Sequence, residues 1–293
     1  MDFKPVLQHL RFRFSLLLLP GYLFSMWAIA LQSKDIVFSH WYYFLIAGIV
    51  WHLFIFPASN AYNGYQDNDT ASVGDIANPL PASKNVYYAS LLFNVIGLCI
   101  SMLINTKFFI MVLIYIIFST LYSYRKVRLK KYAIIGFLTI FIFQGMWVVL
   151  ATAFISPTFI INNQFLLIAL IAGFLFGGGY PISQIYQHKA DKLDGVNTIS
   201  MMLGIKGTLI FSALMFIIGF GLLLLIMFES QLFSQIFILI CSLTPVVFFM
   251  SYWVKNTYRN ATFVNHKNVM TLIWFNAICN NLAYIMLLLY QIN

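Results

Sequence analysis

The chain has 293 residues, of which 61% are hydrophobic and only 9% are charged. Soluble domains carry about 25% charged residues, so this composition excludes a water-soluble globular protein and predicts an all-α integral membrane protein. The net charge of +9 is typical of the basic loops of a membrane protein, and we expect no nucleic-acid partner.

Nine apolar segments approach the length of about 20 residues that a helix needs to cross a bilayer. The basic start of the chain is typical of a signal peptide, but no small-residue cleavage site follows, so we expect a retained first helix. Residues 1–293 are therefore predicted to form a single integral membrane domain. The predicted spans are 14–33, 40–59, 86–105, 108–123, 132–155, 164–183, 207–228, 231–254 and 269–291.

The basic residues are divided unevenly between the two sides of this topology. With the N-terminus inside and nine alternating spans, the inside segments hold 15 of the 17 Lys and Arg residues, and the outside segments hold Lys34 and Lys107. This bias follows the positive-inside rule and supports both the number of spans and their orientation. We therefore expect a cytoplasmic N-terminus in a multi-pass protein of a bacterial inner membrane.

Carboxylates concentrate in two of the inside loops. The two longest inside connections, about residues 60–85 and 184–206, follow the second and sixth spans and hold five of the eight acidic residues. Long loops between closely spaced helices usually carry function. Mg²⁺ binds oxygen ligands, commonly one or two carboxylates together with substrate phosphates. The candidates for such a site are Asp67, Asp69, Asp75, Asp191 and Asp194.

The first of these loops begins with polar residues at helical spacing. If the second helix continues, Asn60, Asn63, Gly64 and Asp67 lie at i, i+3, i+4 and i+7 and share one face. Amide and carboxylate oxygens would then point in one direction. The alternative is a polar helix end whose Asn and Asp side chains cap a loop, and the spacing favours neither.

The second acidic loop is joined by a basic one. Gln187 and Asp191 are four residues apart and so share a helix face, although a solvated loop of mixed charge is the alternative. In the inside loop 122–131, Arg125, Lys126 and Arg128 suit phosphate pairing. The following Lys130 and Lys131 are more typical of a basic loop that sets topology or contacts anionic lipid.

Together these loops resemble the UbiA superfamily of intramembrane prenyltransferases, and the resemblance covers essentially the whole chain. Members of that family have nine helices and two aspartate-rich motifs, on cytoplasmic loops after helices two and six. In the first motif, Asn-x-x-x-Asp-x-x-x-Asp, Asn63 and Asp67 match. The stretch Asn78-Pro79-Leu80-Pro81 that follows is similar to the family's Arg-Pro-Leu-Pro.

The second family motif, Asp-x-x-x-Asp followed by Gly and Thr, matches at Asp191, Gly195 and Thr198, with Leu203-Gly204 at the expected distance. The chain departs from the family pattern at four positions. Gly64 replaces the second residue of the Asn-Asp opening, and Ala71 replaces the last Asp of the first motif. Gln187 replaces the first Asp of the second motif, and Asn78 replaces an arginine.

The resemblance implies Mg²⁺-dependent transfer of an isoprenyl group from a prenyl diphosphate to an aromatic or lipid-like acceptor within the membrane. Metal and basic residues would take up charge as pyrophosphate leaves, and tyrosine faces would shield the cation. The implied metal ligands are Asn63, Asp67, Asp69, Asp75, Gln187, Asp191 and Asp194. The implied diphosphate contacts are Asn60, Asn63, Arg125, Lys126, Arg128 and Lys189. The implied catalytic residues are Asp67, Asp191, Tyr124 and Tyr186.

Two alternatives remain open from the sequence. A terpene cyclase of the same fold would ionise the same donor and let it react with itself, which suits an aromatic content of 18%. A transporter or a non-catalytic membrane protein is the other alternative. Transporters commonly place charged residues near the middle of the membrane, whereas the nine predicted spans contain no Asp, Glu, Lys or Arg.

Overall fold

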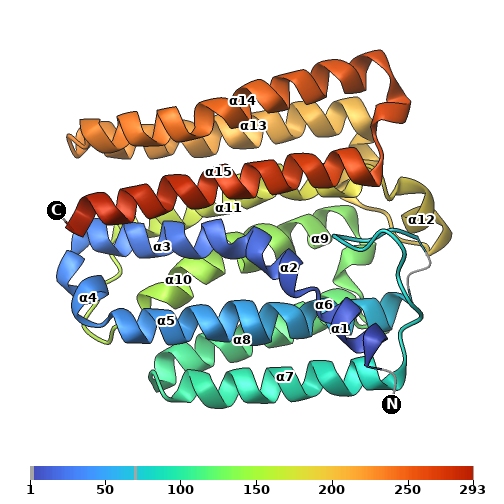
Figure 1. The fold of residues 1–293 in the computed structure, drawn as a ribbon, viewed down its shortest axis with the longest axis horizontal. Coiled ribbons are helices and arrows are strands. Elements are labelled where there is room, and N and C mark those ends of the chain that lie inside the picture. The colour runs from blue at the N-terminus through green and yellow to red at the C-terminus, as the bar shows by residue number, and fades with distance from the viewer. Residues whose placement is uncertain (1–2, 69–70, 293) are drawn as a thin grey trace.

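The computed structural model of the protein describes residues 3–68 and 71–292. Within these residues, nine helical segments are long and apolar enough to cross a membrane, which confirms the predicted spans. The segments lie side by side as a bundle (Figure 1). They are Lys4–Gln32, Trp41–Asp67, Lys84–Met102, Thr106–Ser123, Ala133–Ala153, Asn163–Gln184, Ile199–Glu229, Phe233–Arg259 and His266–Ile292.

Several spans consist of more than one helix. The helices are α1 (Lys4–Leu10), α2 (Phe12–Ser15), α3 (Leu19–Gln32), α4 (Lys34–Ser39), α5 (Trp41–Ile49), α6 (Phe56–Asp67), α7 (Lys84–Met102), α8 (Thr106–Ser123), α9 (Ala133–Ile140), α10 (Trp147–Ala153), α11 (Asn163–Gln184), α12 (His188–Leu193), α13 (Ile199–Glu229), α14 (Phe233–Arg259) and α15 (His266–Ile292). Short connections are made by α4 and α12.

The second and fifth spans are each interrupted by a π-helical turn, at Val50–Ile55 and Phe141–Met146. In the second span, Pro57 follows this turn near the start of α6. Proline has no N–H to donate to the preceding turn, which accounts for a local change of helical pairing. The first span is interrupted at Arg11, whose φ of 48° ends α1 and reorients the chain into α2.

The second and seventh spans extend further than hydropathy predicts. Helix α6 continues to Asp67, beyond the expected end of the apolar segment at residue 59. Helix α13 begins at Ile199, capped by the Thr198 side chain, and bends at Gly204, where φ is 66° and ψ is 175°. A hydropathy profile marks only the apolar part of a helix. The backbone can remain helical beyond that part, where polar side chains contact water or other polar groups. The motif residues of the first loop are therefore helical.

The first span packs against the end of the chain and closes the bundle. The indole nitrogen of Trp27 in α3 donates a hydrogen bond of 2.8 Å to the side-chain oxygen of Gln235 in α14. Phe24 of the same helix packs on Tyr284 of α15, with ring centroids 5.3 Å apart. All four side chains are buried.

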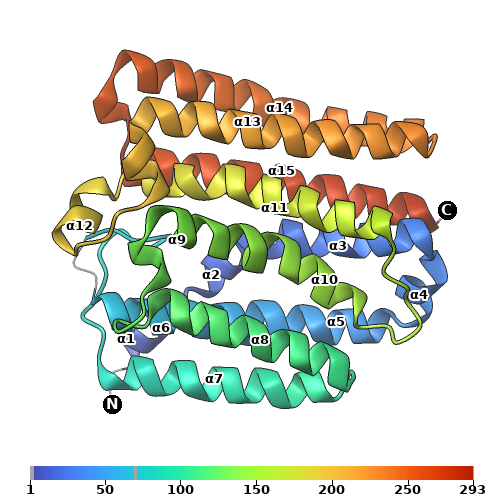
Figure 2. The same ribbon diagram turned by 180° about the vertical axis from the view of Figure 1, so that it is seen from behind.

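The long connections gather at one end of the bundle, which we call the loop end. It comprises residues 71–83, 124–132, 185–198 and 260–265. Figure 2 shows α1 and α12 at this end, and α4 with the C-terminal end of α15 at the opposite end. The predicted motifs of the two acidic loops thus lie at the same end of the molecule.

Candidate active site

Three segments meet at the loop end in a group of ion pairs that we call the ion-pair cluster. Helix α6 contributes two residues, the loop after α8 contributes three basic residues, and the loop after α12 contributes one carboxylate. The cluster consists of Asn63, Asp67, Arg125, Arg128, Lys130 and Asp194.

Arg128 joins the two acidic loops. Its Nη2 donates to Oδ1 of Asp67 at 3.0 Å and also to Oδ2 of Asp194. The side chains of Arg128 and Asp67 are only 7% and 6% exposed. The backbone of Arg128 is left-handed, with φ of 48°, and its N–H closes a turn onto the carbonyl of Tyr124 at 2.7 Å. This turn directs the guanidinium back toward α6.

Lys130 is the second cation that contacts the first motif. Its ammonium group donates to Oδ2 of Asp67 and, at 2.9 Å, to Oδ1 of Asn63. The same Asn63 oxygen accepts a hydrogen bond of 2.7 Å from the hydroxyl of Ser123. Lys130 therefore pairs with the amide oxygen of Asn63 and one carboxylate oxygen of Asp67, while Arg128 takes the other Asp67 oxygen.

Arg125 covers the end of α6. Its Nε donates to the carbonyl of Gln66 at 2.6 Å and its Nη2 to the carbonyl of Asp67 at 3.0 Å. A cation at a helix C-terminus pairs with carbonyls that have no partner in the helix. Its Nη1 also lies 3.0 Å from Oδ1 of Asp194, so the 125–130 loop connects α6 to the loop after α12.

The electrostatics of Asp194 favour its ionised form. Burial acts to raise the pKa of this carboxyl, but the hydrogen bond and charge of Arg128, together with Arg125, outweigh burial and hold its pKa below the usual value. The second acidic loop thus presents a carboxylate that stays ionised at neutral pH.

Asp191 faces the same region from α12. Its charge acts on the hydroxyls of Tyr122 and Tyr180, and that of Asp67 acts on Tyr122 as well. The two hydroxyls are 2.5 Å apart, and Gln184 donates to Tyr180 at 2.8 Å. This tyrosine pair therefore joins the end of α8 to the end of α11.

Other predicted site residues lie around the cluster. The Gln187 amide nitrogen donates to the Ser72 carbonyl at 3.4 Å and to the Tyr186 hydroxyl at 3.1 Å, so this side chain holds the loop after α6. The ring of Tyr186 meets His266 edge-on at 5.3 Å. Tyr124 contributes its carbonyl to the turn of Arg128, while Lys126 and Lys189 are exposed nearby.

Two predicted residues are not brought into the cluster, and a third was not placed. The amide nitrogen of Asn60 is buried without a hydrogen-bond partner. Asp75 lies instead at a second pocket, beside Arg11. Asp69 falls outside the described residues.

A few residues of this region were not expected from the sequence. Ser123 and Tyr122 lie in the predicted basic loop 122–131 but were not assigned to the site, and the sequence favoured a topological role for Lys130. Their contacts join positions about 60 residues apart, such as Ser123 with Asn63. His52, in the second span, was also not considered; its Nδ1 lies 2.8 Å from the Ser15 carbonyl, which indicates a structural contact.

The donor set was tested for its fit to Mg²⁺, the ion that the motifs imply. Within residues 3–68 and 71–292, no three His, Cys, Asp or Glu side chains form a group that could hold a metal. The carboxylates of Asp67 and Asp194 nevertheless converge on one nitrogen of Arg128. Two carboxylates and substrate phosphates are a sufficient ligand set for Mg²⁺. The cluster therefore fits a divalent cation that is bound together with a phosphorylated ligand.

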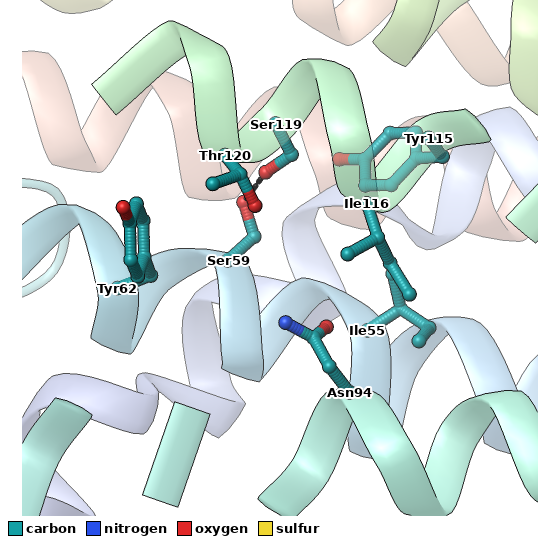
Figure 3. Close-up of a pocket in the computed structure, with 8 residues that line it drawn as sticks. All are labelled: Ile55, Ser59, Tyr62, Asn94, Tyr115, Ile116, Ser119 and Thr120. Carbon is teal, nitrogen blue, oxygen red and sulfur yellow. Dashed lines mark hydrogen bonds between the residues drawn. The ribbon is translucent and has the colours of Figure 1, made fainter. Parts of the chain in front are cut away.

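A small polar cavity lies one helical turn deeper in the bundle. Figure 3 shows it between α6, α7 and α8, with the hydroxyls of Ser59 and Ser119 hydrogen-bonded to each other. These residues precede Asn63 and Ser123 by four positions each, which corresponds to about 6 Å of helix. The cavity has a volume of about 10 Å³, enough for one water molecule but not for an isoprenyl chain.

Gly64 occupies a position that tolerates no side chain. A Cβ built there would lie 2.4 Å from Nδ1 of His9, which is fully buried and hydrogen-bonded through Nε2 to the Leu80 carbonyl at 2.7 Å. Helix α1 thus packs against the face of α6 next to the one that carries Asn63 and Asp67. The departure from the family motif at Gly64 accommodates this contact.

Gly64→Ala is expected to lower the unfolding free energy by about 1–3 kcal/mol, because His9 must move and lose its bond to Leu80. Thermal unfolding in detergent measures the change. Gly221→Ala is the control, since a Cβ there meets nothing within 4 Å. His9→Ala in the Gly64→Ala background should restore part of the loss. Equal effects of the two glycine substitutions would refute the clash.

Comparisons with known proteins agree with this architecture. The model of the UbiA prenyltransferase family matches residues 18–276. A solved structure of a digeranylgeranylglyceryl phosphate synthase is 20% identical, with a TM-score of 0.57 over 100% of this chain and 99% of that chain.

A UbiA homologue from Archaeoglobus fulgidus, bound to GPP and Mg²⁺, is 15% identical, with a TM-score of 0.62 over 97% of this chain and 99% of that chain. The same homologue bound to DMAPP and Mg²⁺ is 16% identical, with a TM-score of 0.61 over 96% and 98% of the two chains. At these identities the likeness concerns the fold. No curated protein sequence matches the chain.

Proposed function

The chain belongs to the UbiA prenyltransferase family, and from this premise we propose that it transfers an isoprenyl group from a prenyl diphosphate to a hydrophobic acceptor within the membrane. The acceptor is proposed to be aromatic or lipid-like. The observation that carries the proposal is the convergence of Asp67, at the end of α6, and Asp194, in the loop after α12, on one nitrogen of Arg128 at the end of an apolar bundle.

The diphosphate of the donor is proposed to bind at the ion-pair cluster together with Mg²⁺. Asp67 and Asp194 would hold the metal with Asn63, while Asp191 approaches from α12. When bound, Mg²⁺ neutralises charge on the phosphate oxygens. The relatives bound to GPP or DMAPP with Mg²⁺ support this class of ligand.

Arg125, Arg128 and Lys130 would change partners when the donor binds. In the structure these three cations pair with the carboxylates. A diphosphate brings further oxygens for guanidinium groups, which bind phosphate in bidentate fashion. The cations would then hold the departing pyrophosphate while the carboxylates turn to the metal, and charge developing on the leaving group would meet fixed positive groups. The exposed Lys126 and Lys189 would add to the positive field at the entrance.

The acceptor and the isoprenoid tail would lie among apolar side chains of the bundle. Below the cluster, the Trp51 ring packs edge-on against Tyr115 at 5.1 Å and stacks on Phe56 at 5.4 Å. Aromatic faces stabilise a nearby cation, which suits an allylic centre that is losing its diphosphate.

A product assay tests the proposal. Purified protein would be incubated with Mg²⁺ and prenyl diphosphates of increasing chain length, with and without aromatic and lipid acceptors. Pyrophosphate release that depends on acceptor and yields a prenylated product is the expected result. Release with a cyclic product and no acceptor would indicate a terpene cyclase. No release with any donor, from protein that binds none of them, would contradict the proposal.

We also propose that the loop end faces the cytoplasm of a bacterial inner membrane, because the inside segments of the predicted topology hold 15 of the 17 Lys and Arg residues. Single cysteines introduced at the exposed Lys126 and Lys34 test this orientation in intact cells. Only the cysteine at position 34 should react with a membrane-impermeant reagent. Labelling at position 126 alone would reverse the orientation.

A further inference from the structure

A second pocket lies at the loop end, apart from the ion-pair cluster. It has a volume of about 480 Å³ and is formed by the start of the first span and the loop after α6. None of its lining residues belongs to the cluster. The chemistry-bearing residues that line it are Gln8, Arg11, Arg13, Asp75 and Asn78.

The walls of this pocket are fixed by hydrogen bonds between the two segments. The Gln8 amide nitrogen donates to the Asn78 carbonyl at 3.1 Å, and its oxygen accepts from the Leu80 N–H at 2.7 Å. His266 of α15 lies 2.8 Å from the Gly74 carbonyl and holds the other side of the loop. These hydrogen bonds hold the loop on both sides and so define the shape of the pocket.

Opposite charges line the pocket. The guanidinium of Arg11 lies against Gly74, where a Cβ would be 2.9 Å from Nη1. Arg13 is positioned over the ring of Trp274, with 5.8 Å between its guanidinium carbon and the ring centroid. Burial raises the pKa of the Asp75 carboxyl, and the nearby charges of Arg11, Arg13 and His266 act against this shift. Two arginines face one carboxylate across the same space.

Asp75 has an unused acceptor. Its Oδ1 is buried and has no hydrogen-bond partner among the described residues. A buried carboxylate oxygen without a donor is costly, so the site favours a ligand that brings an N–H or O–H group. The arginines favour a ligand that also carries an anionic group.

The exposed surface beside the pocket is apolar. Phe3, Leu7 and Leu16 of the first span are 64%, 62% and 46% exposed, on the same segment as Arg11 and Arg13. Exposed apolar residues next to basic ones are typical of helices that lie at the membrane interface. Basic pockets at this level of a helical bundle bind lipid headgroups. A ligand of this pocket would thus be continuous with the lipid layer.

We propose that the pocket binds the headgroup of a phospholipid that carries both a phosphate and a primary ammonium group. The phosphate pairs with Arg11 and Arg13, and the ammonium donates to Asp75. Gln8 and Asn78 lie beside the headgroup, and the acyl chains extend along Leu7. This assigns Asp75 to lipid binding and not to the metal site, and it does not depend on the proposed transferase activity.

Native mass spectrometry of the full-length protein tests this site with three lipids of identical acyl chains. Phosphatidylethanolamine is expected to bind about tenfold more tightly than phosphatidylcholine, whose quaternary ammonium has no N–H for Asp75. Asp75→Asn should abolish this preference and strengthen binding of phosphatidylglycerol. Arg13→Gln should weaken all three lipids about fivefold, because it removes one interfacial cation. Lys267→Gln, an exposed cation at the same end but outside the pocket, is the matched control and should change nothing.

Three results would overturn the proposal. The first is equal binding of the three lipids to the unmodified protein. The second is the same loss for Lys267→Gln as for Arg13→Gln, which would indicate a general surface effect. The third is displacement of the lipid by soluble phosphoethanolamine at equal concentration, which would assign the pocket to a free phosphate compound. Since binding is measured without turnover, failure of the transferase assay leaves this test unaffected.

Discussion

Asp67→Asn is expected to lower prenyl-transfer activity at least about 100-fold, because residues that merely support a metal ligand already contribute 10–100-fold. The Asp67 side chain is nearly fully buried, and its two oxygens pair with Arg128 and Lys130. Asparagine keeps the shape of the side chain but removes the negative charge. Two cations would then face a neutral amide, and the strongest oxygen ligand of the first motif would be lost.

Pyrophosphate release at several Mg²⁺ concentrations measures this effect. Any residual activity should require more Mg²⁺ than the unmodified protein needs, which separates loss of metal binding from general damage. Asp35→Asn is the control, because Asp35 is exposed on α4 at the opposite end of the bundle. If Asp67→Asn and Asp191→Asn both kept full activity, the assignment of the cluster as a metal and diphosphate site would be wrong.

Arg128→Met is expected to lower the unfolding free energy by about 2–3 kcal/mol. Removal of one partner from a buried ion pair costs about 3–5 kcal/mol. The expected loss for Arg128→Met is smaller than this general value because Lys130 remains beside Asp67 and because Asp194 is one-third exposed. Methionine fills a similar volume without the charge, so the loss of unfolding free energy measures the contribution of the ion pairs. Unfolding of the purified protein in denaturing detergent provides the measurement.

Arg125→Met provides the matched comparison, since its guanidinium is 46% exposed and exposed pairs contribute less than about 1 kcal/mol.

The pH dependence of the unfolding free energy gives a second test of the role of Arg128. The lowered pKa of Asp194 stabilises the fold fully above the ordinary aspartate value of about 3.9, and this stabilisation is lost as the pH falls through the lower folded-state value. The difference between the unmodified protein and Arg128→Met should therefore stay constant from about pH 7 to pH 5 and shrink only below about pH 4. Equal losses for the two arginine variants would refute the special role of Arg128.

The number of membrane spans was predictable because it depends on local composition. Apolar length and the distribution of Lys and Arg define nine spans, and the structure contains nine within its described residues. The continuation of α6 to Asp67 was one of two alternatives that the helical spacing left open, and it places Asn63 and Asp67 about one turn apart. Both properties can be read from a short window of sequence.

The partners within the site were not predictable in this way. Lys130 reaches Asn63 and Asp67 because Arg128 adopts a left-handed backbone conformation, which no sequence rule expects of arginine. Gly64 meets His9 of α1, and Asp75 is drawn toward Arg11. These contacts depend on how distant segments pack, so neither the spacing nor the family motif contains the information.

The hydrogen bond between Trp27 and Gln235 has a consequence for biosynthesis. The two residues are 208 positions apart, so a ribosome must synthesise seven further spans before the first helix meets its partner in the eighth. Until then the Trp27 indole and later the Gln235 amide must each remain in the bilayer unpaired, or be held by an insertion chaperone. Nascent chains that stop before α14 would therefore lack the acceptor that the Trp27 indole nitrogen has in the complete bundle.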